Sequence, residues 1–444
     1  MSESSERDQG TMGSGDPDPA RAKLDPSIPR SPDPSPDPPI PQSLPLEGVR
    51  VADFTWVWAG PFCTLQLAHL GAEVIRIESA SRTCVTRLLP PWYRGEFGVN
   101  RSGYFNQYNL GKLSVTLDLK QEKGIQVAKD LVAASDIVCE NFAAGVMDRA
   151  GLGYDELRRI NPTIIMISLS GYGSTGPEHE FVSYGPAQVP LSGMSSLTGY
   201  SGSPPMHVGI SYGDPTGGLH GAVAVLAALM HREYTGEGQY IDLSQQETSI
   251  AVLAEGLLEQ SINGGQPPRC GNRDPLMAPH GVFRCAGEQR WTAIAVRDDE
   301  EWQRFATMIG GAALATDPRF VTLAARKANE DALEAVVTEW TVTRSVEDIV
   351  RSLQAAGIPA FASMSNENLS RDAHLNQSGL FVYPSHPEVG PVQHVGIPWR
   401  MSGTPTSVRR PAPCLGEHTE EILSRVLGYN AATIAELRRE NVLV

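Results

Sequence analysis

Val49-Arg-Val-Ala-Asp-Phe54 and Glu73-Val-Ile-Arg-Ile-Glu78 are the two short runs that decide the fold of this chain. Each run has the length and composition of a β-strand. Residues 61–70 between them are predicted to be a helix, and Gly71 stands where a glycine is expected after a helix C-terminus. Strand, helix and strand in this order form a βαβ unit, so the sequence predicts a Rossmann-like parallel sheet of the α/β class.

The same alternation continues along the chain. Strands are predicted over residues 114–119, 136–140, 163–168 and 239–243, and helices over residues 124–134, 154–160 and 244–258. The loop after the first strand, Trp56-Val-Trp-Ala-Gly-Pro61, lacks the G-x-G-x-x-G pattern of dinucleotide-binding folds. Glu78 ends the second strand, where such folds place a ribose-binding acid, but without the glycines a nicotinamide dehydrogenase is disfavoured.

The pattern changes near residue 275. Residues 281–285 and 291–296 are predicted to form a hairpin, followed by helices over 298–309, 328–339 and 345–356, which together indicate a smaller α+β domain. The chain then has to return to the first domain. The predicted boundaries are 1–45 for a disordered proline-rich tail, 46–250 for the first part of the large domain, 251–272 for a linker, 273–361 for the small domain, 362–395 for a return linker and 396–444 for the last part of the large domain.

Composition excludes several classes of protein. The 444 residues carry a net charge of −15, and this acidic balance disfavours a nucleic-acid partner. The longest clean apolar run, residues 222–230, is about half of what a bilayer requires, so no membrane segment is expected. Six scattered cysteines without a C-x-x-C pair predict neither a zinc site nor a disulfide framework, and they fit a cytoplasmic protein.

The stretch Gly209-Ile-Ser-Tyr-Gly-Asp-Pro-Thr-Gly-Gly-Leu-His-Gly221 contains the most informative single residue, Asp214. One interpretation makes Asp214 the N-cap of a helix that begins at Pro215. In the other, the glycines let a bulky ligand approach the backbone, and the Asp214 carboxylate acts as a nucleophile or a base in a partly dry pocket. Spacing alone leaves both interpretations open and favours the cap.

Seven segments, in a fixed order along the chain, match the pattern of one family. Together they resemble the class III CoA-transferases, the family of formyl-CoA transferase and carnitine CoA-transferase, over residues 46–444. The segments are Asp53-Phe-Thr55 with Ala59-Gly-Pro61, Leu70-Gly-Ala-Glu-Val-Ile-Arg-Ile-Glu78, Asn109-Leu-Gly-Lys112 with Leu117-Asp-Leu-Lys120, Glu140-Asn-Phe142 with Asp148-Arg149, Gly213-Asp214, Thr235-Gly-Glu-Gly-Gln239 and Leu415-Gly-Glu-His-Thr419.

The resemblance implies an activity and a mechanism. Asp214 would be the nucleophile that attacks the thioester of a donor acyl-CoA, forming an aspartyl anhydride and then an aspartyl-CoA thioester. CoA would pass from this intermediate to an acceptor carboxylic acid. Neither a metal ion nor a permanently bound cofactor is implied; CoA and acyl-CoA are substrates. An interlocked homodimer is expected, since the chain leaves the large domain and returns to it.

The resemblance also implies site residues. The substrate-binding residues would be Trp56, Trp58, Ala59 and Tyr184, and the CoA contacts would be Arg76, Leu117, Lys120, Asn141, Phe142 and Arg149. Each has a structural alternative: Arg76 and Lys120 as solvated charges at strand ends, Phe142 as core, Arg149 as a partner of Asp148. Trp56 or Trp58 could equally be core, and Tyr184 could be a half-buried tyrosine with a satisfied hydroxyl.

Departures from the family pattern bear on the substrate. Formyl-CoA transferase has a histidine and a glutamine where this chain has Trp56 and Trp58, and relatives have an acid where it has Gly185. Its glycine-rich lid has no counterpart here, where Met277-Ala-Pro-His-Gly281 occupies roughly that place. We therefore expect a larger, more apolar acid than oxalate or formate, such as an alkyl- or aryl-substituted succinate, with succinyl-CoA as the donor by analogy with relatives.

Two alternatives stay open. An acyl-CoA racemase of the same superfamily would need a histidine paired with the aspartate, at or beside Tyr184, where this chain has none. A catalytically silent CoA-binding protein would retain the fold without needing Asp214.

Overall fold

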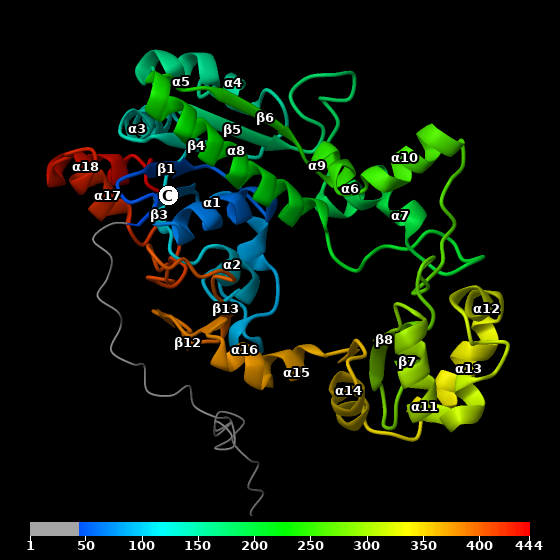
Figure 1. Ribbon diagram of the computed structural model, residues 1–444. Coiled ribbons are helices and arrows are strands. Elements are labelled where there is room, and N and C mark those ends of the chain that lie inside the picture. The colour runs from blue at the N-terminus through cyan, green and yellow to red at the C-terminus, as the bar shows by residue number, and fades with distance from the viewer. Residues whose placement is uncertain (1–43) are drawn as a thin grey trace, which may run out of the picture.

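The computed structural model describes residues 44–444 (Figure 1). The predicted tail, residues 1–45, lies almost entirely outside the described residues. Leu44 and Leu46 are buried, and the Leu46 N–H donates to the Leu70 carbonyl at 3.0 Å. The packed part of the chain therefore begins no later than Leu44.

Six parallel strands form the central sheet, in the order β3-β2-β1-β4-β5-β6. This confirms the predicted α/β fold. The order of the strands along the sheet reverses between β1 and β4, and ligands of open α/β sheets bind at the carboxyl ends of the strands beside such a reversal. The strands are β1 (Arg50–Asp53), β2 (Glu73–Glu78), β3 (Leu113–Thr116), β4 (Ile137–Glu140), β5 (Ile165–Ser170) and β6 (Tyr240–Ser244).

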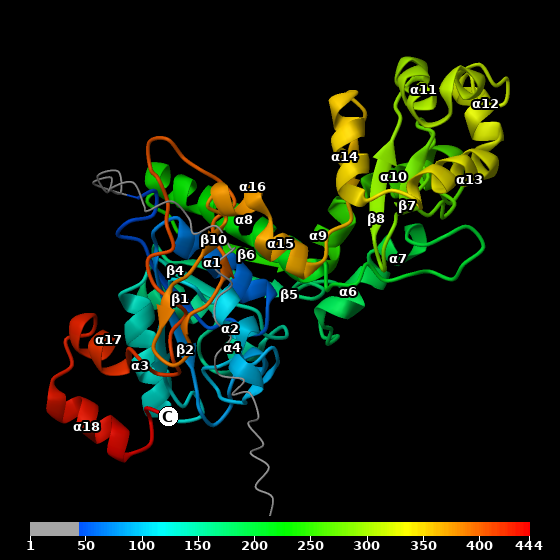
Figure 2. The ribbon, with the colours of Figure 1, turned by 90° about the horizontal axis from the view of Figure 1, so that it is seen from below.

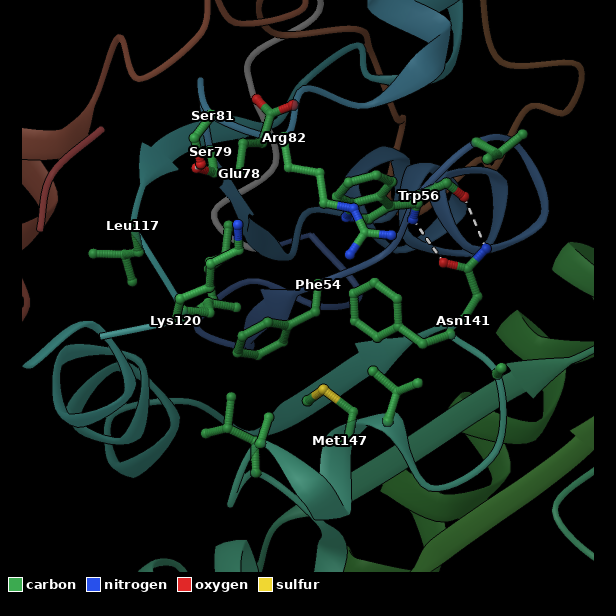
Figure 3. A pocket seen from close by; sticks show the side chains of 18 of the residues that line it. Phe54, Trp56, Glu78, Ser79, Ser81, Arg82, Leu117, Lys120, Asn141 and Met147 are labelled. Atoms are coloured by element: carbon green, nitrogen blue, oxygen red, sulfur yellow. Dashed lines mark hydrogen bonds between the residues drawn. The ribbon is translucent and has the colours of Figure 1, made fainter. Parts of the chain in front are cut away.

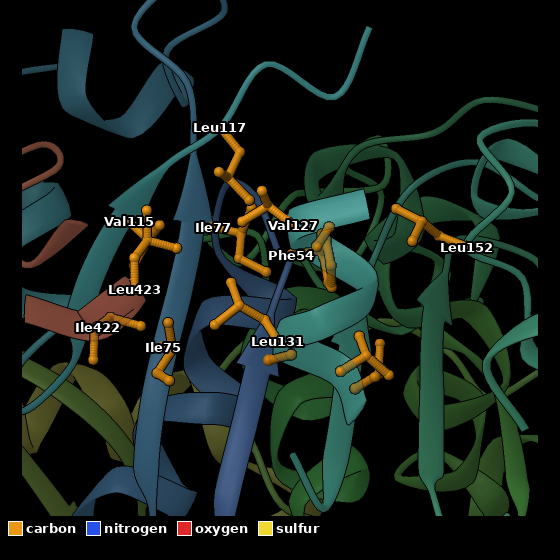
Figure 4. Packing of buried hydrophobic residues seen from close by; sticks show 14 of the residues in the cluster. Phe54, Ile75, Ile77, Val115, Leu117, Val127, Leu131, Leu152, Ile422 and Leu423 are labelled. Carbon is orange, nitrogen blue, oxygen red and sulfur yellow. The ribbon is translucent and has the colours of Figure 1, made fainter. Parts of the chain in front are cut away.

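Helices cover both faces of the sheet (Figures 1 and 2). On one face, α1 (Ala59–His69) and α8 (Gly213–Thr235) pack over a core that includes Cys63, Ile167 and Val225. The other face is covered by α3 (Glu122–Ala133), α5 (Tyr154–Ile160), α17 (Thr419–Arg425) and α18 (Ala431–Arg439). Figure 4 shows this second core, in which Ile422 and Leu423 from the end of the chain meet the strands. Burial on both faces explains why neighbouring residues within a strand are both apolar, as Val51 and Ala52 are in β1 and Val74 and Ile75 are in β2.

The glycines that follow Asp214 serve helix packing. A Cβ at Gly218 would lie 2.7 Å from the Ala59 carbonyl oxygen, and a Cβ at Gly221 would lie 2.8 Å from Leu169 and 3.2 Å from the Cys63 sulfur. These glycines let α8 approach α1 and β5 closely. The expectation that they make room for a ligand is therefore wrong for these two positions, because protein atoms fill the space.

A smaller unit has its own core, which includes Trp302, Phe305 and Phe320. Its antiparallel sheet consists of β7 (His280–Arg284), β8 (Trp291–Ala295) and β9 (Ala360–Ala362), so the predicted hairpin is confirmed. Its helices are α11 (Asp299–Ala315), α12 (Leu323–Ala328), α13 (Glu330–Thr341) and α14 (Val346–Ala355). The exact domain boundaries stay a prediction.

The connections between the two units contain more separate short elements than predicted. The single helix expected over residues 244–258 is wrong: α9 (Gln245–Ala251) and α10 (Ala254–Asn263) replace it, interrupted at Val252 and Leu253. The returning chain carries α15 (Asn366–Arg371), α16 (Ala373–Gln377) and four two-residue strands, β10 (Phe381–Val382), β11 (Ser385–His386), β12 (Gly390–Pro391) and β13 (His394–Val395).

Short helices complete the large unit around the ends of its strands. They are η1 (Val85–Leu88), η2 (Tyr93–Gly95), α2 (Gly103–Tyr108), α4 (Val146–Arg149), α6 (Gly185–Leu191) and α7 (Met194–Leu197). Within residues 44–444, the structure contains no helix with the length and apolar character needed to span a bilayer.

Candidate active site

A cavity of about 500 Å³ lies where the strand order reverses, between the loops that follow β1 and β4 (Figure 3). Its walls are mostly apolar, and its charged groups come from the end of β2 and from the loops after β2 and β3. Six of the predicted site residues line it: Trp56, Leu117, Lys120, Asn141, Phe142 and Tyr184. The position agrees with the general rule for ligand sites in open α/β sheets.

The Trp56 loop is fixed by the side chain of Asn141. The Trp56 N–H donates to Asn141 Oδ1 at 2.6 Å, and Asn141 Nδ2 donates to the Trp56 carbonyl at 2.8 Å. The next peptide is also held, because the Phe142 N–H donates to Glu140 Oε2 at 2.7 Å. Both the oxygen and the nitrogen of the Asn141 amide therefore bond to the backbone of Trp56. Asn141 is a positioning residue for the cavity wall.

Asp214 lies inside the first turn of α8, because the helix begins at Gly213 with Tyr212 as its N-cap residue. The predicted N-cap role is therefore wrong. The backbone N–H of Ala59, the first residue of α1, lies close to the Asp214 carboxylate and, as a hydrogen-bond donor, lowers its pKa. Gly185 lies directly against it: a Cβ there would be 1.7 Å from Asp214 Oδ2.

The electrostatic setting of Asp214 is unusual for a carboxylate. Asp214 is only 7% exposed to solvent. Burial raises the pKa of the carboxyl from 3.8 to about 7, and the hydrogen bond from Ala59 opposes this increase only in part. A partly dry carboxylate with a pKa near neutrality is typical of active sites.

Tyr104 and Tyr108 of α2 lie near enough to this carboxylate for its charge to act on their hydroxyls. Burial raises the pKa of both hydroxyls, and the charge of Asp214 raises them further. The Trp58 ring lies against both tyrosine rings, with centroid distances of 6.0 Å to Tyr104 and 5.2 Å to Tyr108. The Trp58 Nε1 is buried and has no hydrogen-bond partner within the described chain. These rings form an aromatic wall beside Asp214.

Sequence reasoning missed the two tyrosines. Their i, i+4 spacing would place them on one side of a helix, but nothing in the local sequence connects α2 with Asp214, which follows more than a hundred residues later. The structure also separates Trp56 from Trp58. Val57 between them adopts φ of 62°, which is rare for a β-branched residue. Trp56 faces the cavity, and Trp58 packs against α2.

Arg76 does not reach the cavity. Its side chain is buried and pairs with Glu78 at 3.1 Å and with Asp53 at 4.0 Å. Lys112 completes this buried group through Asp53 at 3.2 Å. The expectation that Arg76 contacts CoA is not supported by this placement, and neither is the alternative of a solvated charge, because the surrounding strands bury the guanidinium.

Arg149 and Ala59 do not line this cavity, whereas Tyr184 does. Arg149 lines a second, more polar cavity of about 500 Å³, whose wall shares Phe142 and Met147 with the first. Tyr184 precedes Gly185 and is 67% exposed, so it is not the half-buried tyrosine of the structural alternative. Ala59 contributes its N–H to Asp214.

Comparison with known proteins identifies the class. Residues 46–419 match CoA-transferase family III. The chain therefore belongs to this family, and it is a transferase enzyme, as the resemblance in its sequence indicated.

Curated relatives and a solved structure agree with this assignment. The chain is 34% identical to formyl-CoA:oxalate CoA-transferase of Rhodopseudomonas palustris, covering 88% of this chain and 96% of that one. It is 33% identical to succinate–glutarate CoA-transferase of Agrobacterium fabrum, covering 86% and 96%. A CaiB/BaiF family protein from Brucella suis superposes with a TM-score of 0.80 at 32% identity, covering 87% of this chain and all of that one.

Proposed function

We propose that this enzyme transfers CoA from a donor acyl-CoA to a carboxylic acid and that Asp214 is the nucleophile. The observation that carries the proposal is the setting of Asp214. It is a buried carboxylate at the start of α8 that meets the N-terminus of α1, and its pKa is raised to about 7. Burial removes part of the water that would otherwise weaken a carboxylate as a nucleophile.

The reaction begins with two exchanges at Asp214. A carboxylate oxygen attacks the thioester carbon of the donor; the C–S bond breaks, and the products are a mixed anhydride and CoA thiolate. The thiolate then attacks the aspartyl carbonyl of the anhydride, which forms an aspartyl-CoA thioester and releases the donor acid as its carboxylate.

The second half reverses these steps with the acceptor. The acceptor carboxylate attacks the aspartyl-CoA thioester, giving a second anhydride and CoA thiolate. Attack of the thiolate on the acceptor's acyl carbon yields the new acyl-CoA and regenerates the Asp214 carboxylate. No electron is transferred and no water is consumed. The Ala59 N–H, already directed at the carboxylate, is placed to stabilise negative charge that develops on oxygen beside it.

The cavity at the strand ends is proposed to hold CoA. Leu117 and Phe142 supply apolar wall suited to the pantetheine arm, and Lys120 supplies a cation at its polar side. Asn141 shapes this wall through its bonds to Trp56. Arg76 is left out of the proposed contacts because it is buried in ion pairs, and Arg149 is placed to reach a ligand only from the neighbouring cavity.

The aromatic wall of Trp58, Tyr104 and Tyr108 supports a bulky or apolar acceptor, such as a substituted succinate. Succinyl-CoA as donor is supported by the succinate–glutarate CoA-transferase among the relatives. Oxalate is a second candidate acceptor, because a formyl-CoA:oxalate CoA-transferase is 34% identical to this chain.

A CoA-exchange screen by mass spectrometry tests the proposal. The purified enzyme is incubated with succinyl-CoA and a panel of acids: oxalate, formate, glutarate, and alkyl- and aryl-substituted succinates. New acyl-CoA masses are expected with at least one bulky acid. Bound CoA without any exchange would favour the silent CoA-binding alternative. Deuterium incorporation beside the thioester without exchange would favour a racemase.

A further inference from the structure

Arg82 is a cation in the cavity wall that the proposed mechanism does not use. It follows β2, and its guanidinium carbon lies 5.1 Å from the centroid of the Trp56 ring (Figure 3). Arg82 is exposed and forms no ion pair with a carboxylate of residues 44–444, and its side chain lines the mostly apolar cavity.

The carboxylates nearest in sequence and around the cavity are already engaged. Glu78 lines the same cavity, but its oxygens accept from Arg87 at 2.7 Å and from Ser114 at 2.8 Å, and Arg76 pairs with it at 3.1 Å. Asp118 accepts from the Lys120 backbone at 3.1 Å and from the Gln121 side chain at 3.1 Å. Neither supplies the missing negative charge for Arg82.

We propose that Arg82 binds an anionic group of the substrate inside this cavity. Two parts of the substrate carry the required chemistry: the phosphates of CoA and the second carboxylate of a dicarboxylic acyl group. The inference rests on the proposed function, in that the cavity receives an acyl-CoA. An arginine matches either group through its planar fork of N–H donors.

The geometry around Arg82 fixes the direction of this fork. Trp56 offers a flat face to the guanidinium, a cation–π arrangement. The indole itself is positioned by the paired bonds between the Trp56 backbone and the Asn141 amide. Phe142 packs edge-on against Trp56 at 6.1 Å. Arg82 is exposed in the free protein, and a ligand that displaces water from the cavity would strengthen the attraction between the guanidinium and the anion of that ligand.

Arg94 provides a matched control. Its guanidinium also lies over an aromatic ring, 5.1 Å from the centroid of Tyr93, but neither residue lines the cavity. If stacking on a ring were the whole role of Arg82, the substitutions Arg82→Gln and Arg94→Gln would have similar, small effects.

The test uses ligands that bind but cannot react. Calorimetry measures the dissociation constants of four thioethers: S-(3-carboxypropyl)-CoA, S-butyl-CoA, and the same two groups on pantetheine. Arg82→Gln is expected to weaken binding about tenfold for the ligands that carry the recognised anion, Arg82→Lys by less, and Arg94→Gln not at all.

The four ligands separate the two sources of charge. A loss confined to the two CoA thioethers assigns Arg82 to the phosphates. A loss confined to the two carboxypropyl thioethers assigns it to the second carboxylate. An equal loss for all four ligands, including S-butyl-pantetheine, overturns the proposal, as does no loss for any of them or no binding of any of them to the wild type.

A second variant tests the support from Trp56. Trp56→Leu removes the aromatic ring, so Arg82→Gln should weaken ligand binding less in the Trp56→Leu protein than in the wild type. In the Trp56→Phe protein, Arg82→Gln should weaken binding almost as much as in the wild type. Because these ligands do not react, the measurement is independent of Asp214. If Asp214→Asn still transfers CoA, the proposed mechanism is wrong. The role of Arg82 is then still decided by the dissociation constants of the four ligands.

Discussion

At the residue scale, Asp214 carries the chemistry that we propose. Asp214→Asn is expected to lower the rate of CoA exchange by several orders of magnitude with little change in fold, because an amide of the same size cannot form the anhydride. Exchange is measured by mass spectrometry and folding by the melting temperature. Asp242→Asn, which changes an exposed carboxylate at β6, serves as the matched control. An active Asp214→Asn enzyme would contradict the proposal that Asp214 is the nucleophile.

The raised pKa of Asp214 predicts opposite effects of pH on activity and stability. Because the nucleophile must be ionised, kcat/KM should rise with pH through an apparent pKa near 7. Between pH about 4 and about 7, the folded protein retains a proton that the unfolded chain has lost, so the contribution of this group to stability falls as pH rises and is constant above that window. Across this window, the contribution of Asp214 to the free energy of unfolding falls by at most about 4 kcal/mol.

Urea unfolding at pH 5 and pH 8 checks the stability effect. Asp214→Asn should be more stable than the wild type at pH 8, and the gap should narrow at pH 5. A gap that stays the same at both values would show that Asp214 does not titrate between them.

Gly185 is predicted to be required for the geometry of Asp214. The added methyl group of Gly185→Ala would lie 1.7 Å from Asp214 Oδ2, so the carboxylate has to move. We expect a loss of at least a hundredfold in kcat together with a destabilisation of about 1–3 kcal/mol. Gly403→Ala is the control, because nothing lies within 4 Å of its Cβ position. Full activity of Gly185→Ala would mean that the carboxylate works from another position.

At the scale of elements, the strands were predictable and the site was only partly so. The runs that form β1 and β2 contain neighbouring apolar residues such as Val51 and Ala52 or Val74 and Ile75, because both faces of a parallel sheet are buried, and the βαβ pattern makes them recognisable in the sequence. The role of Arg76 could not be inferred in this way. Its burial depends on Asp53 and Glu78 from the ends of two adjacent strands, which only the folded sheet brings together.

The helix boundaries show the same limit. Asp214 followed by Pro215 has the local chemistry of an N-cap, yet α8 begins at Gly213, one residue earlier, which shows that local sequence signals place a helix end only to within a residue or two. The helix predicted over residues 244–258 breaks at Val252 and Leu253, although neither residue is a glycine or a proline. We have no account of this break from the local sequence.

Helix α2 is predicted to select the acid. Trp58→Ser should remove the ring that joins Tyr104 and Tyr108, so kcat/KM for bulky acids should fall by at least tenfold while the Kd for CoA changes little. Losing a partly buried indole should also cost on the order of 3 kcal/mol of stability. Tyr104→Phe controls for the hydroxyl. If the preference among acids is unchanged while the melting temperature falls, Trp58 contributes only to the packing of the protein core and not to substrate selection.

At the scale of the whole molecule, the path of the chain is informative. It leaves the large unit after α10, builds the small unit around β7 to β9, and returns through α15 and α16 to end in α17 and α18 beside β3 (Figures 1 and 2). The C-terminal residues complete the core over α3, so the large unit is finished only when the last segment is in place.

Large apolar side chains are exposed on α8 and on α10. Val223 is 66% exposed and Met230 is 62% exposed, and on α10 Leu257 and Ile262 are exposed as well. Exposed apolar side chains of this size are common at interfaces between proteins. We propose that a second copy of the chain covers them in a homodimer.

Light scattering at micromolar concentration is expected to give twice the mass of one chain. A pair of substitutions, Val223→Glu with Ile262→Glu, should convert the protein to monomers, because two carboxylates would have to be buried without partners in the interface. Val342→Glu, which alters an exposed apolar residue of the small unit after α13, should leave the mass unchanged. A wild-type mass near one chain would contradict the dimer, and a dimer that survives the paired substitution would place its interface on another surface.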